Sequence, residues 1–410
     1  MREQKHILNK LTYLVMIMII GFYSLGLAPK ENEKKIHSNI TIQNIDVGKL
    51  TEKQAINKLK STYPLKDFII TYNNERWTIK PESIDLNYHI EEMVKEAFNY
   101  TRSSSTMENI KRKSKLNLKK EHNIKLKATY DEIKLSKKLE VICNKINVDA
   151  VDATFRVELT GELKTTESKE GREVDLSRLK EDIYDMINKK KIEDINLPVI
   201  TLYPKVSTKQ VKSINSVLGE FSTSFNNSTS RGSNIHVAGQ QTSDILLMPG
   251  DTFSYNKCTG ARNWVNGYKS APVIVGGKVT NGEGGGVCQV STTIYNAALM
   301  SGLTIDEVHN HSLPSRYVQR GRDATVSYGY TDLKFTNPFT NPVYIKNIIG
   351  NGAITSKIYG CNLDREKIII KIVEEYRKNK ITVQTYRLFL DEENNIMKKE
   401  LVNTSFYNPN

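Results

Sequence analysis

The N-terminal part of the chain is the most apolar stretch of the sequence. Residues 11–28 form a nearly unbroken apolar run, and Lys5 and Lys10 precede it. A membrane span needs about 20 apolar residues, and leading positive charges favour a cytoplasmic N-terminus. The pattern predicts a transmembrane anchor at 11–28, after a cytoplasmic tail at 1–10 and before a linker at 29–40.

The same apolar run also has one feature of a cleaved signal peptide. Gly26-Leu27-Ala28 puts small residues where a signal peptidase cuts, but Pro29 at the next position is unfavourable for cleavage. We therefore expect the segment to be retained, in a single-pass protein of the cell membrane whose bulk is extracellular, in a Gram-positive-type bacterial envelope.

Between residues 41 and 205, short alternating runs and amphipathic stretches follow one another. The first series comprises a strand at 42–47, a capping box at Thr51–Gln54 that opens a helix, a hairpin at 68–79 and a helix at 90–100. A second series begins near Ala153 and contains an amphipathic segment at 176–187. The region is predicted to hold two small α+β repeats.

A glycine run meets an apolar helical stripe at residues 284–300. Gly285 and Gly286 precede Cys288, and apolar residues at helical spacing follow it. Unpaired N–H groups at a helix N-terminus favour an anion and lower a cysteine pKa. The bare backbone, together with the amide of Gln289 or Cys288 itself, can stabilise an oxyanion. Cys288 is thus a candidate nucleophile, and a buried structural cysteine is the alternative.

Two histidines follow at a distance that returns the chain to this cysteine. A helix ending near Gly302 advances about 21 Å, and roughly six or seven extended residues cover that distance back. His309 and His311 lie on this extended segment, where side chains two apart share a face. One of them is expected beside Cys288 as a general base, and His311 is favoured, whereas His309 also fits a polar loop.

A carboxylate near the histidines is a candidate for orienting the imidazole. Asp323 lies in the segment Gly321–Val326, before an apparent strand, and would be the third member of a triad. Pairing with Arg320 or Arg322 in a turn is the alternative, and Asp332 is a second candidate for either task.

Several of these segments occur in a family-specific order. They are Met248–Tyr255, Gly260–Arg262, Gly267–Tyr268, Ala271–Pro272, the glycine-cysteine stretch, His309–Ser312 and Gly321–Val326. Together they resemble a VanW domain, which we assign to residues 206–360. The resemblance implies a bacterial protein associated with the cell wall, and some members of the family have been tied to L,D-transpeptidation of peptidoglycan.

Carried over by position, the resemblance implies roles for individual residues. Cys288 would be the nucleophile, His311 the general base and Asp323 a weaker third member. The candidate substrate-binding residues are Arg262, Tyr268 and Arg322. The better-known L,D-transpeptidases share a Ser/Thr-His-Gly-Cys type motif, and this chain has no His-Gly-Cys. The same activity would therefore use a different scaffold.

The second series, from Ala153 to Ile200, resembles the peptidoglycan-binding module that commonly precedes VanW domains, and we assign the region 41–205 to such repeats. Gly171, Arg172 and Asp175 stand at matching places. The resemblance implies peptidoglycan-binding repeats, and rigid spacers would have the same sequence.

The formal net charge is +13, with a sequence pI near 9.2. Inside a cell this would suggest nucleic acid, whereas outside it the natural partners are wall polymers with phosphate or carboxylate groups. We expect peptidoglycan stem peptides and wall polymers as partners, and no nucleic acid. Biased base composition is the alternative source of the lysines.

The four cysteines are too few and too scattered for a disulfide framework, and no CxxC spacing is present. We expect no cofactor and no metal. A bridge between Cys258 and Cys288, and a metal site formed by Cys288, His309 and His311, are the alternatives.

The predicted fold class is α+β: an N-terminal transmembrane helix, two small α+β repeats, and a mixed α+β VanW domain whose cysteine-bearing helix packs on an antiparallel sheet. Alternating apolar and polar positions from Asp332 onward, including a β extension at 361–410, predict antiparallel strands that complete this sheet and have no chemistry of their own. The predicted function is L,D-transpeptidation through a cysteine thioester, or carboxypeptidation with water as acceptor. The alternative is a noncatalytic peptidoglycan-binding protein linked to glycopeptide resistance or envelope integrity.

Overall fold

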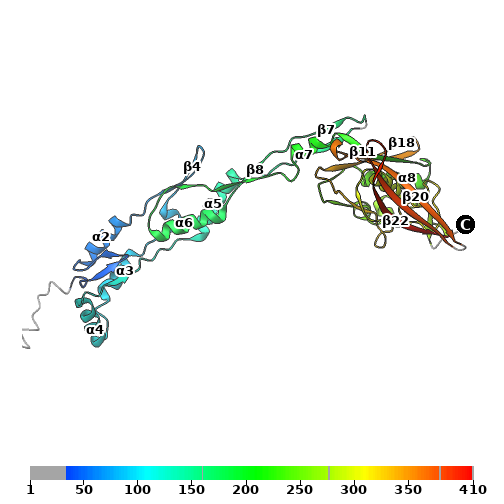
Figure 1. The fold of residues 1–410 in the computed structure, drawn as a ribbon. Helices are drawn as coiled ribbons and strands as arrows, with labels where there is room; N and C mark the ends of the chain where they lie inside the picture. The colour runs from blue at the N-terminus through cyan, green and yellow to red at the C-terminus, as the bar shows by residue number, and fades with distance from the viewer. Residues whose placement is uncertain (1–33, 159, 276–277, 378–379, 409–410) are drawn as a thin grey trace, which may run out of the picture. The chain divides into compact units, whose positions relative to one another are not determined.

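The structure is a computed structural model that describes residues 34–158, 160–275, 278–377 and 380–408. The chain divides into two compact units (Figure 1). The N-terminal unit comprises the residues up to Asp149 together with Arg172–Leu202, and the C-terminal unit comprises Ala150–Gly171 and Tyr203–Asn410.

The N-terminal unit alternates short strands and helices around one apolar core. Its helices are α2 (Glu52–Thr62), α3 (Ile90–Asn99), α4 (Thr106–Asn117), α5 (Glu132–Ile146) and α6 (Leu176–Lys189). Its strands are β1 (Ile40–Ile42), β2 (Ile45–Asp46), β3 (Phe68–Tyr72), β4 (Glu75–Ile79), β5 (His122–Ile124), β8 (Gly171–Val174), β9 (Ile195–Asn196) and β10 (Val199–Leu202). They form sheets of order β2-β1-β5, β4-β3-β9 and β10-β8, in which the pairs β1–β5 and β3–β9 are parallel.

Local signals determine the first of these elements. The Thr51 side chain accepts from the Gln54 N–H at 3.3 Å, and the Gln54 side chain accepts from the Thr51 N–H at 3.0 Å. This is the predicted capping box, and the helix that it opens buries Ala55 and Leu59. The predicted hairpin is also present, as the antiparallel pair β3–β4.

The C-terminal unit is built around a buried helix. Its helices are α7 (Thr208–Ser213), α8 (Ser230–Gln241), α9 (Tyr255–Thr259) and α10 (Val287–Met300). Its strands before residue 361 are β6 (Phe155–Val157), β7 (Leu163–Thr165), β11 (Ser216–Ser224), β12 (Ile245–Leu247), β13 (Thr252–Ser254), β14 (Ser270–Val275), β15 (Lys278–Glu283), β16 (Thr304–Glu307), β17 (Lys334–Thr336), β18 (Val343–Gly350) and β19 (Ala353–Gly360). The largest of the sheets, of order β11-β19-β18-β12, is antiparallel.

Helix α10 contacts β11 and β19 of this sheet and is also in contact with α8. Its residues from Gln289 to Leu299 are all buried, so the helix is enclosed on every side. Gly219 of β11 permits the close approach, because a Cβ there would lie 2.8 Å from the Ala297 carbonyl oxygen. The predicted helix after the glycine run is therefore present and packs on an antiparallel sheet.

The C-terminal strands form a separate sheet. Strands β20 (Lys367–Arg377), β21 (Lys380–Leu390) and β22 (Ile396–Tyr407) pair in this order and antiparallel. We expected the alternating segments from Asp332 onward to complete the sheet beside α10. Strands β18 and β19 do lie in that sheet, whereas β20, β21 and β22 do not. Arg387 of β21 instead donates to the carbonyl oxygens of Leu299 and Leu303 at 3.3 and 2.7 Å, and so satisfies acceptors at the C-terminal end of α10.

The predicted transmembrane helix at 11–28 lies outside the described residues. Within them, no helix is long and apolar enough to cross a bilayer. The longest, α5, has 15 residues, whereas a span needs about 20. The fold class with a transmembrane helix, the membrane anchoring and the single-pass location are therefore corrected, and the described fold is mixed α+β.

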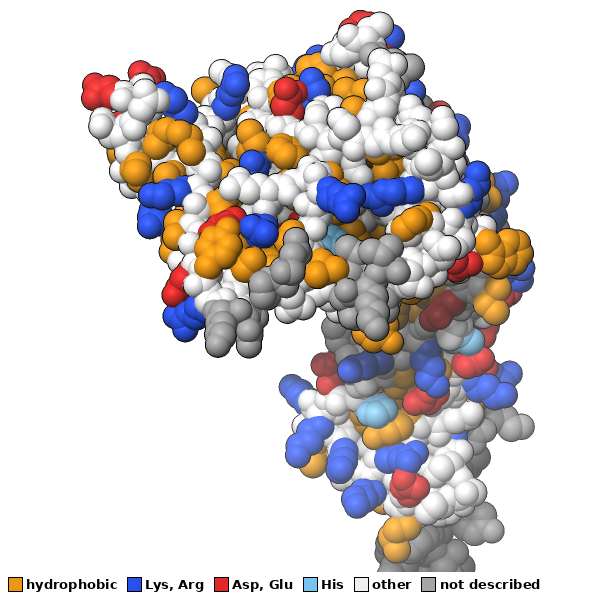
Figure 2. Space-filling model, turned by 90° about the vertical axis from the view of Figure 1, so that its right-hand side faces the viewer, with side chains coloured by type: hydrophobic (Ala, Val, Ile, Leu, Met, Phe, Trp, Pro, Cys, Tyr) orange, Lys and Arg blue, Asp and Glu red, His pale blue; other side chains and the backbone are white. Residues whose placement is uncertain are grey.

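Charged side chains are spread over the surface. On the face in Figure 2, Lys and Arg side chains are interspersed with Asp, Glu and hydrophobic side chains. Several ion pairs on the N-terminal unit are exposed at both ends, as in Lys60–Glu91, where the side chains are 57% and 58% exposed. Such pairs contribute little to stability.

Candidate active site

Cys288 lies in the first turn of α10, directly after the glycine run. Gly286 is the N-cap, with a φ of 113° that side chains rarely adopt. A Cβ on Gly285 would lie 2.6 Å from the Pro272 carbonyl oxygen, so the chain approaches β14 closely at this point. The glycines thus determine both where α10 begins and which way Cys288 points.

Cys288 is partly exposed as a residue and lines an open cleft of about 1810 Å³. Segments from β11, α8, β14, the glycine run and the loops 311–317 and 325–328 line this cleft. The thiol donates to the Val326 carbonyl oxygen at 3.6 Å. Cys288 therefore lies at the wall of the cleft and not in an enclosed apolar interior.

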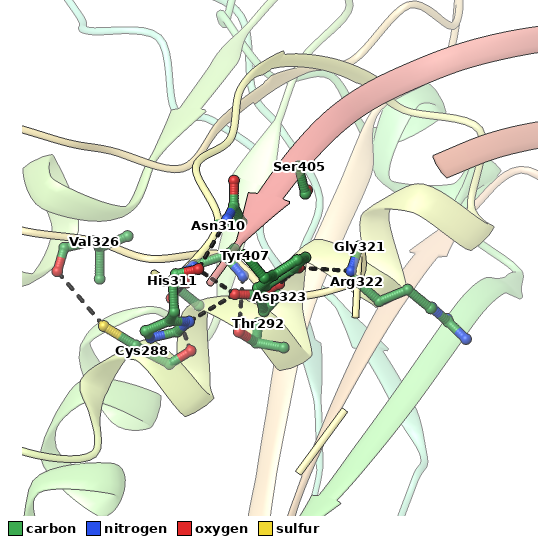
Figure 3. Close-up of polar contacts among 12 residues, drawn as sticks. Cys288, Thr292, Asn310, His311, Gly321, Arg322, Asp323, Val326, Ser405 and Tyr407 are labelled. Carbon is green, nitrogen blue, oxygen red and sulfur yellow. Dashed lines mark hydrogen bonds and ion pairs between the residues drawn. The ribbon is translucent and has the colours of Figure 1, made fainter. Parts of the chain in front are cut away.

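His311 lies between Cys288 and Asp323 (Figure 3). The imidazole interacts electrostatically with the Cys288 side chain, and its Nδ1 lies 2.7 Å from Asp323 Oδ2. The backbone N–H of His311 donates to the same oxygen at 2.7 Å. The side chain of His311 is 10% exposed and that of Asp323 only 1%. The structure thus brings three of the predicted residues together in a chain of side-chain contacts.

The electrostatics of the series Cys288–His311–Asp323 favour an ion pair between Cys288 and His311. Burial by itself raises the pKa of the Cys288 thiol, but the hydrogen bond and the charge of His311 outweigh it and lower this pKa below its ordinary value. Burial lowers the pKa of His311, but hydrogen bonds to Asp323 and Cys288 raise it to about 10. Both shifts favour transfer of the thiol proton of Cys288 to the imidazole of His311.

The amide of Cys288 itself is the free donor at this helix N-terminus. The Gln289 N–H donates to the Gly286 carbonyl oxygen at 3.0 Å, so it is occupied. No acceptor for the Cys288 N–H is found among the described residues. Of the two amides considered as oxyanion donors, the geometry therefore favours that of Cys288.

The Gln289 side chain is buried and supports the wall of the cleft through hydrogen bonds. Its Nε2 donates to the Thr223 hydroxyl at 3.0 Å and to the Ser224 carbonyl oxygen at 2.9 Å. Its Oε1 accepts from Arg231 at 2.8 Å. Hydrogen bonds of Gln289 therefore link α10 to β11 and position Arg231 at the cleft.

Charged side chains that line the cleft are mostly basic. Arg231, Arg262 and Arg316 stand against a single acid, Glu283, among the described lining residues. Arg262 donates to Asn256 Oδ1 at 2.6 Å, and its Nε and Nη1 have no hydrogen-bond partner in the described part of the chain. The positive charge of Arg262 also helps to lower the pKa of Cys288. The cleft is suited to an anionic ligand.

Three predicted site residues lie elsewhere. His309 is exposed and contacts Glu307 Oε1 at 3.1 Å, away from the sulfur. Tyr268 is buried and donates to Gln241 at 2.7 Å. Arg322 donates to Asn296 along α10 at 2.7 Å. None of the three lines the cleft.

The alternatives for the cysteines can be compared with the structure. All four cysteines are free, so Cys258 and Cys288 are not bridged. Burial and the charge of Asp332 raise the pKa of Cys258 to about 11, in contrast to Cys288. Within the described residues, no group of three or more His, Cys, Asp or Glu side chains could hold a metal ion.

Some residues that border the site come from distant parts of the chain and were not predicted as site residues from the sequence. Arg231 lies in the first part of the VanW-like region, ahead of the segment Met248–Tyr255, and stands in no motif. Tyr317 lines the cleft, and Tyr407 of β22 donates a hydrogen bond to Asp323. Tyr407 follows Asp323 by 84 residues, and no local pattern marks a contact of that range.

Comparisons with known proteins agree with this architecture. Residues 230–359 match the family described as VanW like protein, and residues 77–196 match the family described as "Putative peptidoglycan binding domain". The chain therefore contains a region similar to a peptidoglycan-binding domain followed by a region similar to a VanW domain, in the order that the sequence predicted. Both matches indicate a function related to the cell wall.

Two relatives share part of the chain. "Uncharacterized protein YoaR" of Bacillus subtilis (strain 168) is 37% identical over 176 residues, which is 42% of this chain and 58% of that protein. "Vancomycin B-type resistance protein VanW" of Enterococcus faecalis (strain ATCC 700802 / V583) is 32% identical over 109 residues, 25% of this chain and 40% of that protein. The chain thus spans about half the length of these relatives. No solved structure matches the chain.

Proposed function

We propose that this protein is a cysteine-dependent L,D-transpeptidase that cross-links the stem peptides of peptidoglycan. The observation that carries the proposal is the contact of Cys288 with His311, and of His311 with Asp323, at the wall of an open cleft. The two domain matches support the cell wall as the place of action.

The first half of the reaction forms a thioester. The Cys288 thiolate attacks the carbonyl carbon of the donor stem, and the Cys288 N–H stabilises the oxyanion. The C–N bond to the terminal residue then breaks, and the His311 imidazolium gives its proton to the departing amine. The resemblance implies that this bond follows the L-configured centre of the diamino acid at the third stem position.

The second half releases the enzyme. The amine of a second stem attacks the thioester carbonyl, neutral His311 takes up the amine proton, and the Cys288 thiolate leaves. Asp323 accepts from Nδ1 throughout, which keeps Nε2 directed at the sulfur. Water in place of the amine would make the same site a carboxypeptidase.

The charge of the cleft supports this substrate class. Stem peptides are peptides with free carboxylates, and three arginines against one glutamate line the cleft. A cleft of one sign of charge concentrates ligands of the opposite sign near the nucleophile. The peptidoglycan-binding domain would hold wall polymers and so keep donor stems within reach.

Incubation of the purified protein with disaccharide-tetrapeptides, followed by mass spectrometry of the products, tests the proposal. The wild type should form dimers with a 3→3 cross-link, and Cys288→Ala should form none. The matched control is Cys258→Ala, which removes a thiol that faces no part of the cleft and should keep the activity. Equal products from Cys288→Ala and the wild type would refute the proposal.

A noncatalytic wall-binding protein is the second candidate, because the match at residues 77–196 is to a binding domain. It predicts that wild type and Cys288→Ala sediment equally with purified sacculi and that neither forms a cross-link. Binding together with Cys288-dependent dimers would assign both activities to one chain.

A further inference from the structure

The carboxylate that contacts His311 is itself held by the C-terminal sheet. Tyr407 lies near the end of β22 and is buried, with 1% of its surface exposed. Its hydroxyl oxygen accepts from the Gly321 N–H at 2.7 Å, so its only proton is free to be donated. That proton goes to Asp323 Oδ1 in a short hydrogen bond.

Both oxygens of Asp323 are therefore committed. Oδ2 accepts twice from His311, from the backbone N–H and from Nδ1, each at 2.7 Å. Oδ1 accepts from Tyr407 on the other side of the carboxylate (Figure 3). Rotation of the carboxylate would break bonds at both ends, so Tyr407 limits where Asp323 can hold the imidazole.

Further contacts fix the loop that bears His311 and Asp323 to the same sheet. Asn310 Nδ2 donates to the Phe406 carbonyl oxygen at 2.7 Å, and the Asn408 N–H donates to the Ser312 carbonyl oxygen at 3.1 Å. At the other end of the loop, the Thr385 hydroxyl donates to the Gly321 carbonyl oxygen at 2.7 Å. Strands β21 and β22 thus hold both ends of the loop.

We propose that Tyr407 is a positioning residue of the Cys288 site, and that the sheet β20-β21-β22 is a working part of this site. The sheet lies beyond residue 359, where the match to the VanW family ends. The catalytic importance of this positioning rests on the proposed function, but the experiment that tests the positioning needs no peptidoglycan. It also assigns a role to a region in which the sequence indicated no chemistry.

Tyr407→Phe removes the hydroxyl and retains the ring. The matched control is Tyr344→Phe, because Tyr344 is also buried in the C-terminal unit and donates to a carboxylate, Asp244, at 2.5 Å, but lines no part of the cleft. Both variants lose one tyrosine–aspartate hydrogen bond. Only Tyr407→Phe loses one that leads to His311.

The measurement is the rate of alkylation of Cys288 by iodoacetamide between pH 5 and pH 9, followed by mass spectrometry of the peptide that contains Cys288. Loss of a hydrogen bond to a charged group is expected to slow alkylation of Tyr407→Phe at pH 6 by about tenfold and to move the acid limb upward by about one pH unit. Tyr344→Phe should follow the wild-type profile, although it unfolds at a lower temperature.

A wild-type pH profile for folded Tyr407→Phe would overturn the proposal, and so would an equal shift in both variants. If Tyr407→Phe does not fold, Thr385→Val replaces it, since this change loosens Gly321 without touching Asp323. A slower reaction at pH 6 then supports the proposal, and an unchanged profile overturns it. A shifted Tyr407→Phe profile in a protein that forms no cross-links would retain the positioning role and reject the proposed function.

Discussion

The two units bury very different kinds of side chains. In the N-terminal unit, the buried polar residues among those described are only Thr41 and Thr101. The C-terminal unit buries many more polar side chains, among them Gln289, Asp323 and Arg387. Buried polar groups cost stability unless each has its partner, and so they are retained where they determine a single geometry or perform chemistry. The contrast separates a unit stabilised by apolar packing from one that also buries many polar side chains around the Cys288 cleft.

The largest expected effect is the loss of cross-linking activity in His311→Ala. Without the imidazolium, Cys288 loses the group that stabilises its thiolate and the acid that protonates the leaving amine. Cross-linking should fall by about 10³-fold or more, while the fold is retained. His309→Ala is the control, because His309 contacts Glu307 at the surface and should keep full activity. Equal losses in both variants would remove the distinction between the two histidines.

The next largest effect is on the free energy of unfolding and tests how much the buried polar side chains of the C-terminal unit contribute to stability. Arg387 is 3% exposed, pairs with Glu400 at 2.9 Å and donates to two carbonyl oxygens at the C-terminal end of α10. Arg387→Met should destabilise the C-terminal unit by about 3–5 kcal/mol in urea unfolding, since acceptors and an acid lose their partner. Lys60→Met removes an exposed ion pair of the N-terminal unit and should change its stability by less than about 1 kcal/mol. Similar losses would contradict the contrast between the units.

A smaller effect is expected from Ile183→Val in the N-terminal core. Ile183 is fully buried in α6, and loss of one methylene group should cost about 0.5–1.5 kcal/mol. The alkylation profile of Cys288 should remain that of the wild type, because the residue belongs to the other unit. A changed profile would show that the site depends on packing of the N-terminal unit.

Local signals in the sequence predicted much of the fold. The capping box at Thr51 and the helix after Gly286 were recognisable, because the groups that start a helix are its neighbours in sequence. The length of α10 also predicted that a histidine would return to Cys288. The assumption that His309 and His311 share one strand face was wrong, because β16 ends at Glu307.

Long-range contacts could not be predicted in the same way. Tyr407 lies 84 residues from Asp323, and the alternating pattern of β22 indicates a strand without its partner. The apolar run at 11–28 predicted a membrane span, but it lies outside the described residues, and no described helix has the required length and apolarity. Hydropathy reports a property of a segment, whereas a site depends on which segments meet.

The state of the Cys288 thiol tests the account most directly. Thiolate absorbance near 240 nm can be titrated in a variant in which Cys143, Cys258 and Cys361 are replaced by serine. Because the pKa of Cys288 is lowered and that of His311 is raised to about 10, the thiolate should form below the ordinary thiol pKa and remain paired until His311 loses its proton near pH 10. In His311→Ala the titration should move to higher pH. A wild-type thiol that titrates at or above its ordinary pKa, and does so equally in His311→Ala, would contradict the account.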